Sequence, residues 1–293
     1  GEDTLSLHDA LPIWVVDSLE VILADYLGFC YGVKRAIKIA RENAAPDGSA
    51  CTLGPIIHNP QMVERLKDEG VGTIDCLDDL KRGKVIIRSH GVGPETYERA
   101  EAMGLECVDA TCPHVKKAQL SAKELAEEGR FVVIVGEKEH PEVHSIVQWA
   151  GGNVAVIETV AEAASVPNVS RLGIISQTTF SGERFREIVS ALLDKSRDIR
   201  VMRTICTATD QRQRAARELA SKVDVMLVIG GKNSANTTRL AQLCAKICRT
   251  YHIETAEELR PAWFDNIEKI GITAGASTPD WIIKEVYKKC QRI

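Results

Sequence analysis

Three of the nine cysteines occupy the same local setting. They are Cys30 in GFCYGVKRAI, Cys112 in DATCPHVKKA and Cys206 in TICTATDQRQRA, each after an apolar or extended run and before a basic amphipathic segment. A cysteine at the start of a helix, with cations one turn later, has its thiolate stabilised by the helix dipole and by those cations. Three such thiolates suit an iron–sulfur cluster. We therefore predict that these three cysteines are the metal ligands of one shared cluster.

The other six cysteines lack this setting and are predicted to be structural. An odd number of cysteines in a chain of this size argues against a disulfide framework. The sequence has no CxxC pair, so zinc ribbons and thioredoxin-like motifs lose their usual spacing.

A second set of polar residues follows the apolar runs of the chain. In open parallel sheets ligands bind beyond the carboxyl ends of the strands, so these positions are candidate binding residues. Imidazoles, hydroxyls and amides at helix starts can form a nest for a diphosphate. The histidines are His58, His90 and His140, and the other candidates are Gln177, Thr178, Thr179, Ser234, Ala235, Asn236 and Ser277.

One carboxylate, Glu142, stands two residues after His140 and directly after Pro141. Burial can raise the pKa of such a group until it serves as a proton donor. We therefore predict that Glu142 acts as a general acid. His140 is a further catalytic candidate because it adjoins this carboxylate.

Nucleotide-binding fingerprints are missing from the chain. No GxGxxG follows an apolar run, and GxxxxGK[ST] is absent. Electrons for a redox reaction are therefore expected from a donor protein such as ferredoxin or flavodoxin, rather than from a bound nicotinamide.

The segments that position these residues alternate between extended apolar runs and stretches with the hydrophobic period of a helix. Short β-branched runs alternate with segments of helical period, which is typical of an α/β fold with parallel sheets. The predicted strands are 20–23, 85–87, 131–135, 154–157, 172–175, 223–229 and 270–273, and the predicted helices are 116–128, 181–195, 210–221 and 279–289, the last with Thr278 as its N-cap.

The spacing of the three cysteines predicts the domain organisation. They are about 82 and 94 residues apart, and about 87 residues follow the last of them. We expect three similar small α/β domains in a pseudo-threefold arrangement around a central iron–sulfur cluster. The expected domains are 19–112, 113–204 and 205–293, and residues 1–18 are expected to be a non-native or disordered extension.

The charge balance excludes some functions. The chain of 293 residues has 37 Lys and Arg against 41 Asp and Glu, so it lacks the basic excess that nucleic-acid binding requires. No apolar run is long enough to span a membrane, and the start does not resemble a signal peptide. These features favour a cytoplasmic protein.

The chain resembles the 4-hydroxy-3-methylbut-2-enyl diphosphate reductase family (IspH/LytB) from about residue 21 to its end. The resemblance rests on GFCYGV, GPIIHNP, RSHGV, DATCP, HPEV, SQTT, TICTAT, KNSAN and TAGAS, in that order. It implies the last step of the non-mevalonate isoprenoid pathway, in which reductive dehydroxylation of an allylic diphosphate gives isopentenyl and dimethylallyl diphosphate.

The resemblance also implies roles for individual residues. The three cysteines would hold a [4Fe–4S] cluster whose fourth iron is open to the substrate. The strand-end histidines, Ser234, Asn236 and Ser277 would hold the diphosphate, and Glu142 and Thr178 would work near the substrate hydroxyl. The sequence departs from the family pattern at His144-Ser145 after HPEV, and at Ala235 in KNSAN.

Two other functions fit three clustered cysteines. A quinolinate synthase-like dehydratase also gathers a three-cysteine [4Fe–4S] cluster from three α/β domains. A non-enzymatic iron–sulfur redox protein is the second alternative, but it would ordinarily use four cysteines and shield its cluster. The ordered strand-end motifs favour the reductase.

Overall fold

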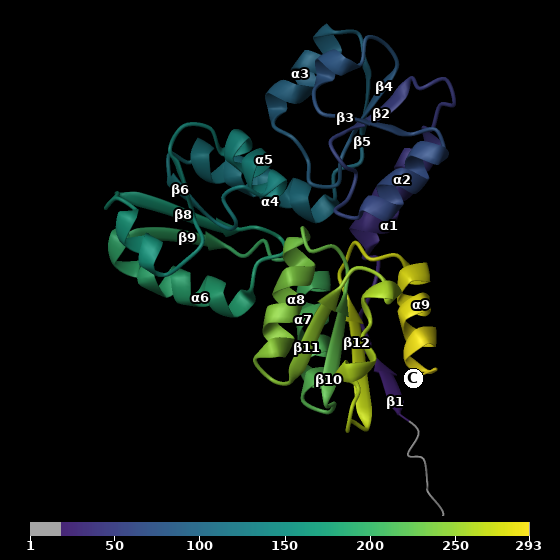
Figure 1. The fold of residues 1–293 in the computed structure, drawn as a ribbon. Coiled ribbons are helices and arrows are strands. Elements are labelled where there is room, and N and C mark those ends of the chain that lie inside the picture. Colours follow the sequence, from purple (N-terminus) through teal and green to yellow (C-terminus); the bar gives the residue numbers. More distant parts are fainter. Residues whose placement is uncertain (1–18, 293) are drawn as a thin grey trace, which may run out of the picture.

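Residues 19–292 are described by a computed structural model, in which they form three lobes that meet at a common centre (Figure 1). Each lobe is built on one four-stranded sheet, and the strands of all three sheets are parallel. This α/β architecture confirms the predicted fold class. The extension predicted at 1–18 lies outside the described residues.

The first lobe contains the sheet with strand order β3-β2-β4-β5, and the second lobe contains the sheet with order β7-β6-β8-β9. The first lobe comprises α1 (Tyr31–Glu42), β2 (Ala50–Leu53), α2 (Pro60–Asp68), β3 (Gly72–Ile74), β4 (Lys84–Ile87), α3 (Pro94–Ala102) and β5 (Glu106–Asp109). The second lobe comprises α4 (Pro113–Glu127), β6 (Phe131–Val135), α5 (Pro141–Ala150), β7 (Val154–Ile157), β8 (Arg171–Ser176), α6 (Gly182–Ala191) and β9 (Asp198–Met202).

The third lobe contains the sheet with order β1-β12-β10-β11. Its elements are β1 (Glu20–Leu23), α7 (Thr207–Ala220), β10 (Val225–Ile229), α8 (Ala235–Ala245), β11 (Arg249–Ile253), β12 (Lys269–Ala274) and α9 (Asp280–Cys290). The sequence division assigned residue 19 onward to the first domain, whereas β1 pairs with β12 in the third lobe, with Glu20 opposite Lys269. A four-residue strand carries no sequence signal that identifies its partner.

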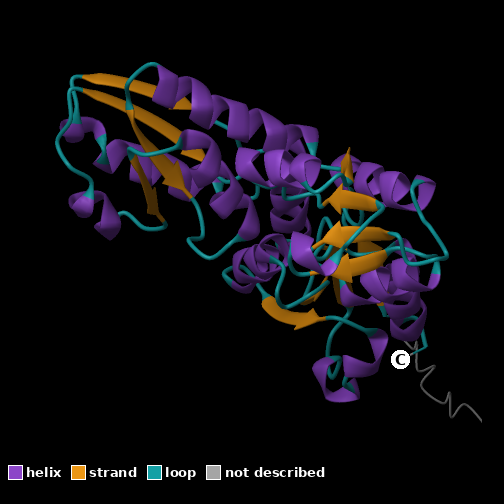
Figure 2. Cartoon of the chain, turned by 90° about the horizontal axis from the view of Figure 1, so that it is seen from above, coloured by secondary structure: helices purple, strands orange, loops and turns teal. Residues whose placement is uncertain are grey.

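Helices cover both faces of each sheet (Figures 1 and 2). In the second lobe, α4 and α5 pack on one face, and α6 packs on the other. In the first lobe α1 and α2 lie opposite α3, and in the third α7 and α8 lie opposite α9. Central strands such as β10, with sequence VMLVI, are therefore buried along their whole length, as expected for a parallel sheet covered on both sides.

The predicted elements agree with the structure apart from their ends. Strands β1, β6 and β7 have the predicted bounds, and α4 and α7 each begin three residues earlier than predicted. The N-cap of α9 is Pro279 rather than Thr278, whose hydroxyl donates instead to the carbonyl oxygen of Ile229 at 2.9 Å. None of the helices in 19–292 is both long and apolar enough to cross a membrane.

Candidate active site

The candidate site lies where the carboxyl ends of the central strands meet. The two central strands are β2 and β4 in the first sheet, β6 and β8 in the second, and β10 and β12 in the third. Strand order reverses between the members of each pair, which makes each pair a topological switch point. The three switch points face one cavity, so residues distant in sequence surround a single space.

The first strand of each pair leads into a helix whose N-cap carries a polar side chain. Asn59 caps α2, His140 caps α5 and Ser234 caps α8, each accepting a hydrogen bond from a backbone N–H of its helix. Proline at the first position of α2 and of α5 favours these helix starts. Three helix N-termini are thereby directed at the cavity, where they favour a bound anion.

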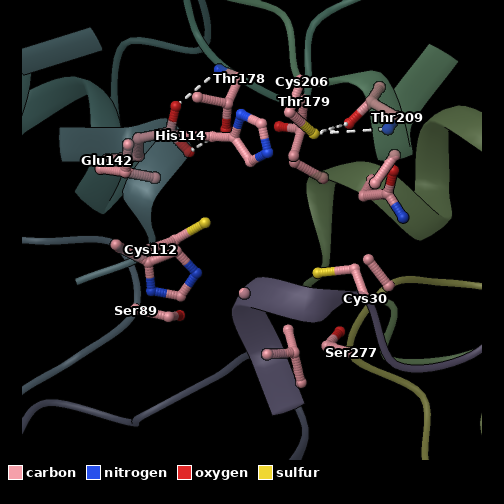
Figure 3. A pocket seen from close by; sticks show the side chains of 18 of the residues that line it. Cys30, Ser89, Cys112, His114, Glu142, Thr178, Thr179, Cys206, Thr209 and Ser277 are labelled. Atoms are coloured by element: carbon pink, nitrogen blue, oxygen red, sulfur yellow. Dashed lines mark hydrogen bonds between the residues drawn. The ribbon is translucent and has the colours of Figure 1, made fainter. Parts of the chain in front are cut away.

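The three predicted metal ligands are the N-cap residues of equivalent helices. Cys30 precedes α1, Cys112 precedes α4 and Cys206 precedes α7, and each stands where the chain passes from one lobe to the next. All three line the same cavity, and Figure 3 shows their sulfur atoms around one open space. The structure thus brings the three cysteines to one cavity, as the sequence predicted.

Gly32 makes room for two of these sulfur atoms. A Cβ atom on this residue would lie 2.4 Å from Sγ of Cys112 and 3.9 Å from Sγ of Cys30. The shorter distance is a clash, so any side chain at position 32 would displace Cys112. The absence of a Cβ keeps the space between the cysteines free, and the three sulfur donors fit an iron–sulfur cluster.

Burial changes the expected protonation of the cysteines. It raises the pKa of Cys112 to about 11 and also raises the pKa of Cys206, where hydrogen bonds from Thr209 act in the opposite direction. We expected the helix starts to stabilise the thiolate form of these cysteines. At Cys112 and Cys206 the opposite effect of burial is larger. A bound metal displaces such protons, so these thiols remain competent ligands.

His58, His90 and His140 form a compact triad. Their ring centroids are 4.3, 5.3 and 5.5 Å apart, and the three side chains come from two lobes. Burial lowers the pKa of His58, lowers that of His90 strongly and lowers that of His140 to about 3. All three imidazoles are therefore neutral in the free protein at pH 7.

The spacing of the triad also suits a metal ion, because its ligand atoms lie within 4.8 Å of one another. The hydrogen bonding of His140 favours an anion instead. Its Nδ1 accepts a hydrogen bond from the Glu142 N–H at 3.1 Å. The proton of the neutral ring is then on Nε2, which makes that nitrogen a donor rather than a metal ligand.

Several buried polar atoms of the triad and of the cavity wall have no hydrogen-bond partner. They include Nε2 of His58, Nδ1 of His90, Oγ1 of Thr179 and both amide atoms of Asn236. Buried polar atoms are nearly always hydrogen-bonded in folded proteins, so an unpaired group in a cavity indicates a ligand. The N–H and O–H groups among these atoms can donate to phosphate oxygens.

Glu142 lies at the start of α5 and is 2% exposed. Its two carboxyl oxygens accept hydrogen bonds from the N–H and the hydroxyl of Thr178, at 2.6 and 2.8 Å (Figure 3). Burial raises the pKa of Glu142 to about 7, and the bonds from Thr178 limit the increase. A carboxyl group with this pKa can deliver a proton at neutral pH.

Ser145, one of the departures from the family pattern, links two parts of the site. Its hydroxyl lies 2.8 Å from the carbonyl oxygen of Glu142 and 3.2 Å from that of His90, and it accepts a hydrogen bond from Gln119. Ala235 lines the cavity as the first residue of α8. Neither departure disrupts the cavity.

The cavity brings together every predicted site residue except Gln177. The side-chain oxygen of Gln177 accepts a hydrogen bond from the Glu137 N–H at 3.0 Å, and this residue is absent from the described cavity wall. The wall also contains polar residues that were not predicted. They are Ser89, His114, Thr209 and Arg212.

Thr209 is the unpredicted residue with the clearest local signal. It stands three residues after Cys206, in the first turn of α7, and its hydroxyl lies 3.0 Å from the cysteine sulfur. The third residue after an N-cap faces that cap across the first turn of the helix, so the spacing alone could have identified Thr209.

Residues 21–291 match the family model described as LytB protein. This chain belongs to the LytB family. A relative from Geobacter sulfurreducens is 51% identical over 274 residues, covering 93% of this chain and 97% of the relative. Another from Pelobacter propionicus is 52% identical and covers 94% and 99% of the two chains. Both relatives are named 4-hydroxy-3-methylbut-2-enyl diphosphate reductase.

Two solved LytB-family structures share the fold. One, described as (E)-4-hydroxy-3-methyl-but-2-enyl diphosphate reductase, the terminal enzyme of the non-mevalonate pathway, is 46% identical with a TM-score of 0.70 and covers 94% of this chain and 100% of its own. The corresponding reductase from Plasmodium falciparum is 28% identical with a TM-score of 0.87, covering 92% and 87%.

Proposed function

We propose that this chain is a 4-hydroxy-3-methylbut-2-enyl diphosphate reductase that produces isopentenyl and dimethylallyl diphosphate. Its membership of the LytB family and the names of relatives about 50% identical along nearly their whole length support this activity. The observation that carries the proposal is one cavity lined by three cysteines, three neutral imidazoles and a buried carboxyl group. The cysteines can bind a metal, the imidazoles can bind an anion, and the carboxyl group can donate a proton.

The reaction sets clear chemical requirements. The allylic C–O bond breaks, two electrons and two protons enter, and one molecule of water leaves. One proton converts the departing hydroxide into water, and the other forms a C–H bond at either end of the allylic system. The site must therefore hold the diphosphate, deliver a proton to the hydroxyl and exclude bulk water.

Cys30, Cys112 and Cys206 would hold a [4Fe–4S] cluster, with Gly32 keeping the space between two of the sulfur atoms free. When bound, the cluster would relay the electrons of a reductant and would offer an iron with Lewis acidity. Three cysteine ligands leave one iron without a protein ligand, which suits a catalytic rather than a purely electron-carrying cluster.

The diphosphate is bound by the polar end of the cavity. The histidine triad donates through its N–H groups, and Thr179, Ser234, Asn236 and Ser277 add hydroxyls and an amide. The helix N-termini add favourable partial charge for the diphosphate. Holding the diphosphate places the other end of the short substrate near the cysteines, so binding also orients the hydroxyl.

Glu142 and Thr178 transfer the proton. A protonated Glu142 can donate to the hydroxyl oxygen of Thr178, which leaves the Thr178 proton free to be donated to the substrate oxygen. His140 positions this pair, because its ring accepts the N–H of Glu142 at the start of α5. Gln177 supports the site indirectly, because its side-chain oxygen accepts a hydrogen bond from the Glu137 N–H and so holds that loop.

The electrons come from a protein donor such as ferredoxin or flavodoxin, since the chain has no nucleotide-binding fingerprint. We also propose the cytoplasm as the location, because all nine cysteines are free, as is usual in a reducing compartment. The two alternatives, a quinolinate synthase-like dehydratase and a non-enzymatic redox protein, are not favoured by the LytB-family match.

An anaerobic assay tests the proposal. The chain is reconstituted with iron and sulfide, purified, and mixed with 4-hydroxy-3-methylbut-2-enyl diphosphate and dithionite. We expect about four irons per chain and formation of both five-carbon diphosphates. The unphosphorylated diol serves as the matched control and should react poorly. Absence of both products from a fully loaded protein would refute the proposal.

A further inference from the structure

Arg212 is a buried cation in the wall of the active-site cavity. It lies on α7, six residues after Cys206, and is only 5% exposed. The same wall contains the three cysteines. The proposed mechanism assigns no role to this arginine.

Neutral groups accept the hydrogen bonds of Arg212. Nη2 donates to the carbonyl oxygen of Gly28 at 2.6 Å, and Nη1 donates to the carbonyl oxygen of Ala208 at 3.0 Å. Nε is buried without a partner. The first bond ties α7 to the loop that carries Cys30, but none of these contacts neutralises the positive charge.

Within 19–292, no carboxylate lies within ion-pair distance of Arg212. Two other arginines with little exposure, Arg130 and Arg239, have such partners. Arg130, which is 8% exposed, pairs with Glu128 at 2.7 Å and with Asp198 at 2.8 Å. Arg239 pairs with Glu137 at 2.7 Å. A buried charge without a counter-ion strongly destabilises a folded protein, so the lack of one at Arg212 requires an explanation.

Two of the proposed cluster ligands, Cys30 and Cys206, interact electrostatically with Arg212. Burial lowers the pKa of Arg212, and the charges of Cys30 and Cys206 act against that decrease. Both cysteines have their sulfur atoms in the cavity that Arg212 lines. The negative charge that Arg212 lacks among the side chains is therefore available from the metal site.

We propose that Arg212 is the protein's counter-ion for the iron–sulfur cluster and that its charge favours the reduced state of the cluster. This inference rests on the proposed function, because it requires the cluster. Arg212 is a positioning and electrostatic residue, since nothing places it against the substrate. Its bond to Gly28 fixes it beside the Cys30 loop.

The direction of the effect follows from the charges. The oxidised core carries two positive charges against three thiolates, so the site is already anionic, and the electron accepted from a reductant adds a further negative charge. No covalent bond changes in this step. A fixed guanidinium in a buried site interacts more strongly with the doubly negative state, which makes reduction more favourable.

The test compares three variants reconstituted anaerobically. Arg212→Gln removes the charge, Arg212→Lys keeps it, and Arg214→Gln removes an exposed charge from the same helix. Iron and sulfide are counted for each variant, and the midpoint potential is measured by electron paramagnetic resonance during titration with dithionite. We expect reduction of Arg212→Gln to be at least tenfold less favourable, a midpoint lower by about 59 mV. The midpoint potentials of Arg212→Lys and Arg214→Gln should remain close to that of the parent.

A fully loaded Arg212→Gln protein with the parent's midpoint would overturn the proposal. If Arg212→Gln does not retain the cluster, the proposal is tested by the midpoint potential of Arg212→Lys instead. A parent-like midpoint in that variant supports the role of charge, whereas loss of the cluster or a lowered midpoint shows that the guanidinium acts through its hydrogen bonds.

Thermal denaturation gives a second readout. A counter-ion matters only when the cluster is present, so Arg212→Gln should lower the melting temperature of the loaded protein more than that of the empty protein. Equal decreases would indicate a purely structural arginine and would overturn the proposal. A parent protein that binds no iron would refute the proposed function itself, and an iron-loaded parent with unshifted variants would refute the Arg212 proposal alone.

Discussion

Both oxygens of the Glu142 carboxyl group are bound by a single residue, Thr178, at 2.6 and 2.8 Å. Glu142 stands at the start of α5, and Thr178 follows the end of β8, the strand adjacent to β6 in the same sheet. The pairing therefore depends on the parallel register of two central strands. It joins a carboxyl group with a pKa of about 7 to a hydroxyl at the cavity wall.

Replacing Glu142 by Gln should abolish most turnover without removing the metal site. Glutamine preserves the size of the side chain but has no transferable proton, and general acid catalysis contributes roughly 10²–10⁴-fold. We expect a loss of kcat in that range with unchanged iron content. In the parent, kcat/KM should decrease as pH rises through about 7, because Glu142 must be protonated, and this inflection should be absent from the variant.

Glu139→Gln provides the matched control, because its side chain is 96% exposed in the loop that precedes α5. It should leave the activity and the pH profile unchanged. Near-normal turnover of iron-loaded Glu142→Gln would remove this carboxyl group from the mechanism, and loss of iron would make it structural.

The raised pKa of Glu142 also predicts how stability depends on pH. The folded state binds a proton at this site up to pH of about 7, while the unfolded chain releases it near the ordinary glutamate pKa of 4.5. Stability from this group is therefore complete below pH of about 4.5 and is lost as pH rises toward 7. Between these limits the slope is about 1.4 kcal/mol per pH unit.

Urea denaturation at several pH values measures this effect. The difference in unfolding free energy between Glu142→Gln and the parent should change in favour of the variant as pH rises. A difference that stays constant between pH 5 and 8 would show that the pKa of Glu142 is not raised.

Thr178→Val and Thr178→Ser separate the hydroxyl from the rest of the residue. Valine keeps the backbone N–H bond to Glu142 but cannot relay a proton, so turnover should decrease at least tenfold. Because the hydroxyl bond lowers the pKa of Glu142, its loss should move the inflection of kcat/KM to higher pH. Serine should restore most turnover and the original inflection. Parent-like turnover in Thr178→Val would exclude a relay through this hydroxyl.

Much of the site could be predicted because its residues follow a local rule. Strand 131–135 is a continuous apolar run, β-branched after Phe131, with its predicted bounds, and the polar residues beyond such strands must gather at one edge of a parallel sheet. The matching settings of three cysteines likewise indicated three helix starts. These signals need only a few adjacent residues.

Other features depend on contacts that no local pattern encodes. Gln177 follows β8 as predicted, yet its side chain bonds to Glu137 rather than lining the cavity. Arg212 lies in the basic stretch DQRQRA, which resembles a solvated helix face, and only the fold shows that this arginine is buried. The pairing of β1 with β12 joins strands about 250 residues apart in the sequence, Glu20 opposite Lys269, and has no signal in either strand.

Single cysteine substitutions distinguish cluster ligands from structural thiols. Cys30→Ser, Cys112→Ser and Cys206→Ser should each lose most iron and activity, since three protein ligands leave little redundancy. Cys244→Ser is the control, because Cys244 is fully buried in the third lobe and does not line the described cavity. Iron analysis and visible absorption of anaerobically reconstituted variants measure the outcome. Full iron content and activity in Cys112→Ser would contradict the assignment.

Asn236 should bind substrate rather than stabilise the fold. It is 6% exposed, and both of its amide atoms lack partners in the free protein. Asn236→Ala therefore removes no hydrogen bond from the folded state, and its melting temperature should match or exceed that of the parent. Its KM should rise about tenfold to a hundredfold, as expected for a lost hydrogen bond to a charged group. Asn233→Ala, at an exposed position in the preceding loop, should change neither quantity.

His58→Ala extends this test to the histidine triad. Nε2 of His58 is also buried without a partner, so KM should rise by a similar factor. Inorganic pyrophosphate should inhibit the parent competitively and should bind both Asn236→Ala and His58→Ala more weakly, because it presents only the anionic part of the substrate. Calorimetric titration of each iron-loaded variant with pyrophosphate separates this binding from catalysis. Unchanged pyrophosphate affinity together with a lowered melting temperature would show that these residues support the fold, and would move the anion site elsewhere in the cavity.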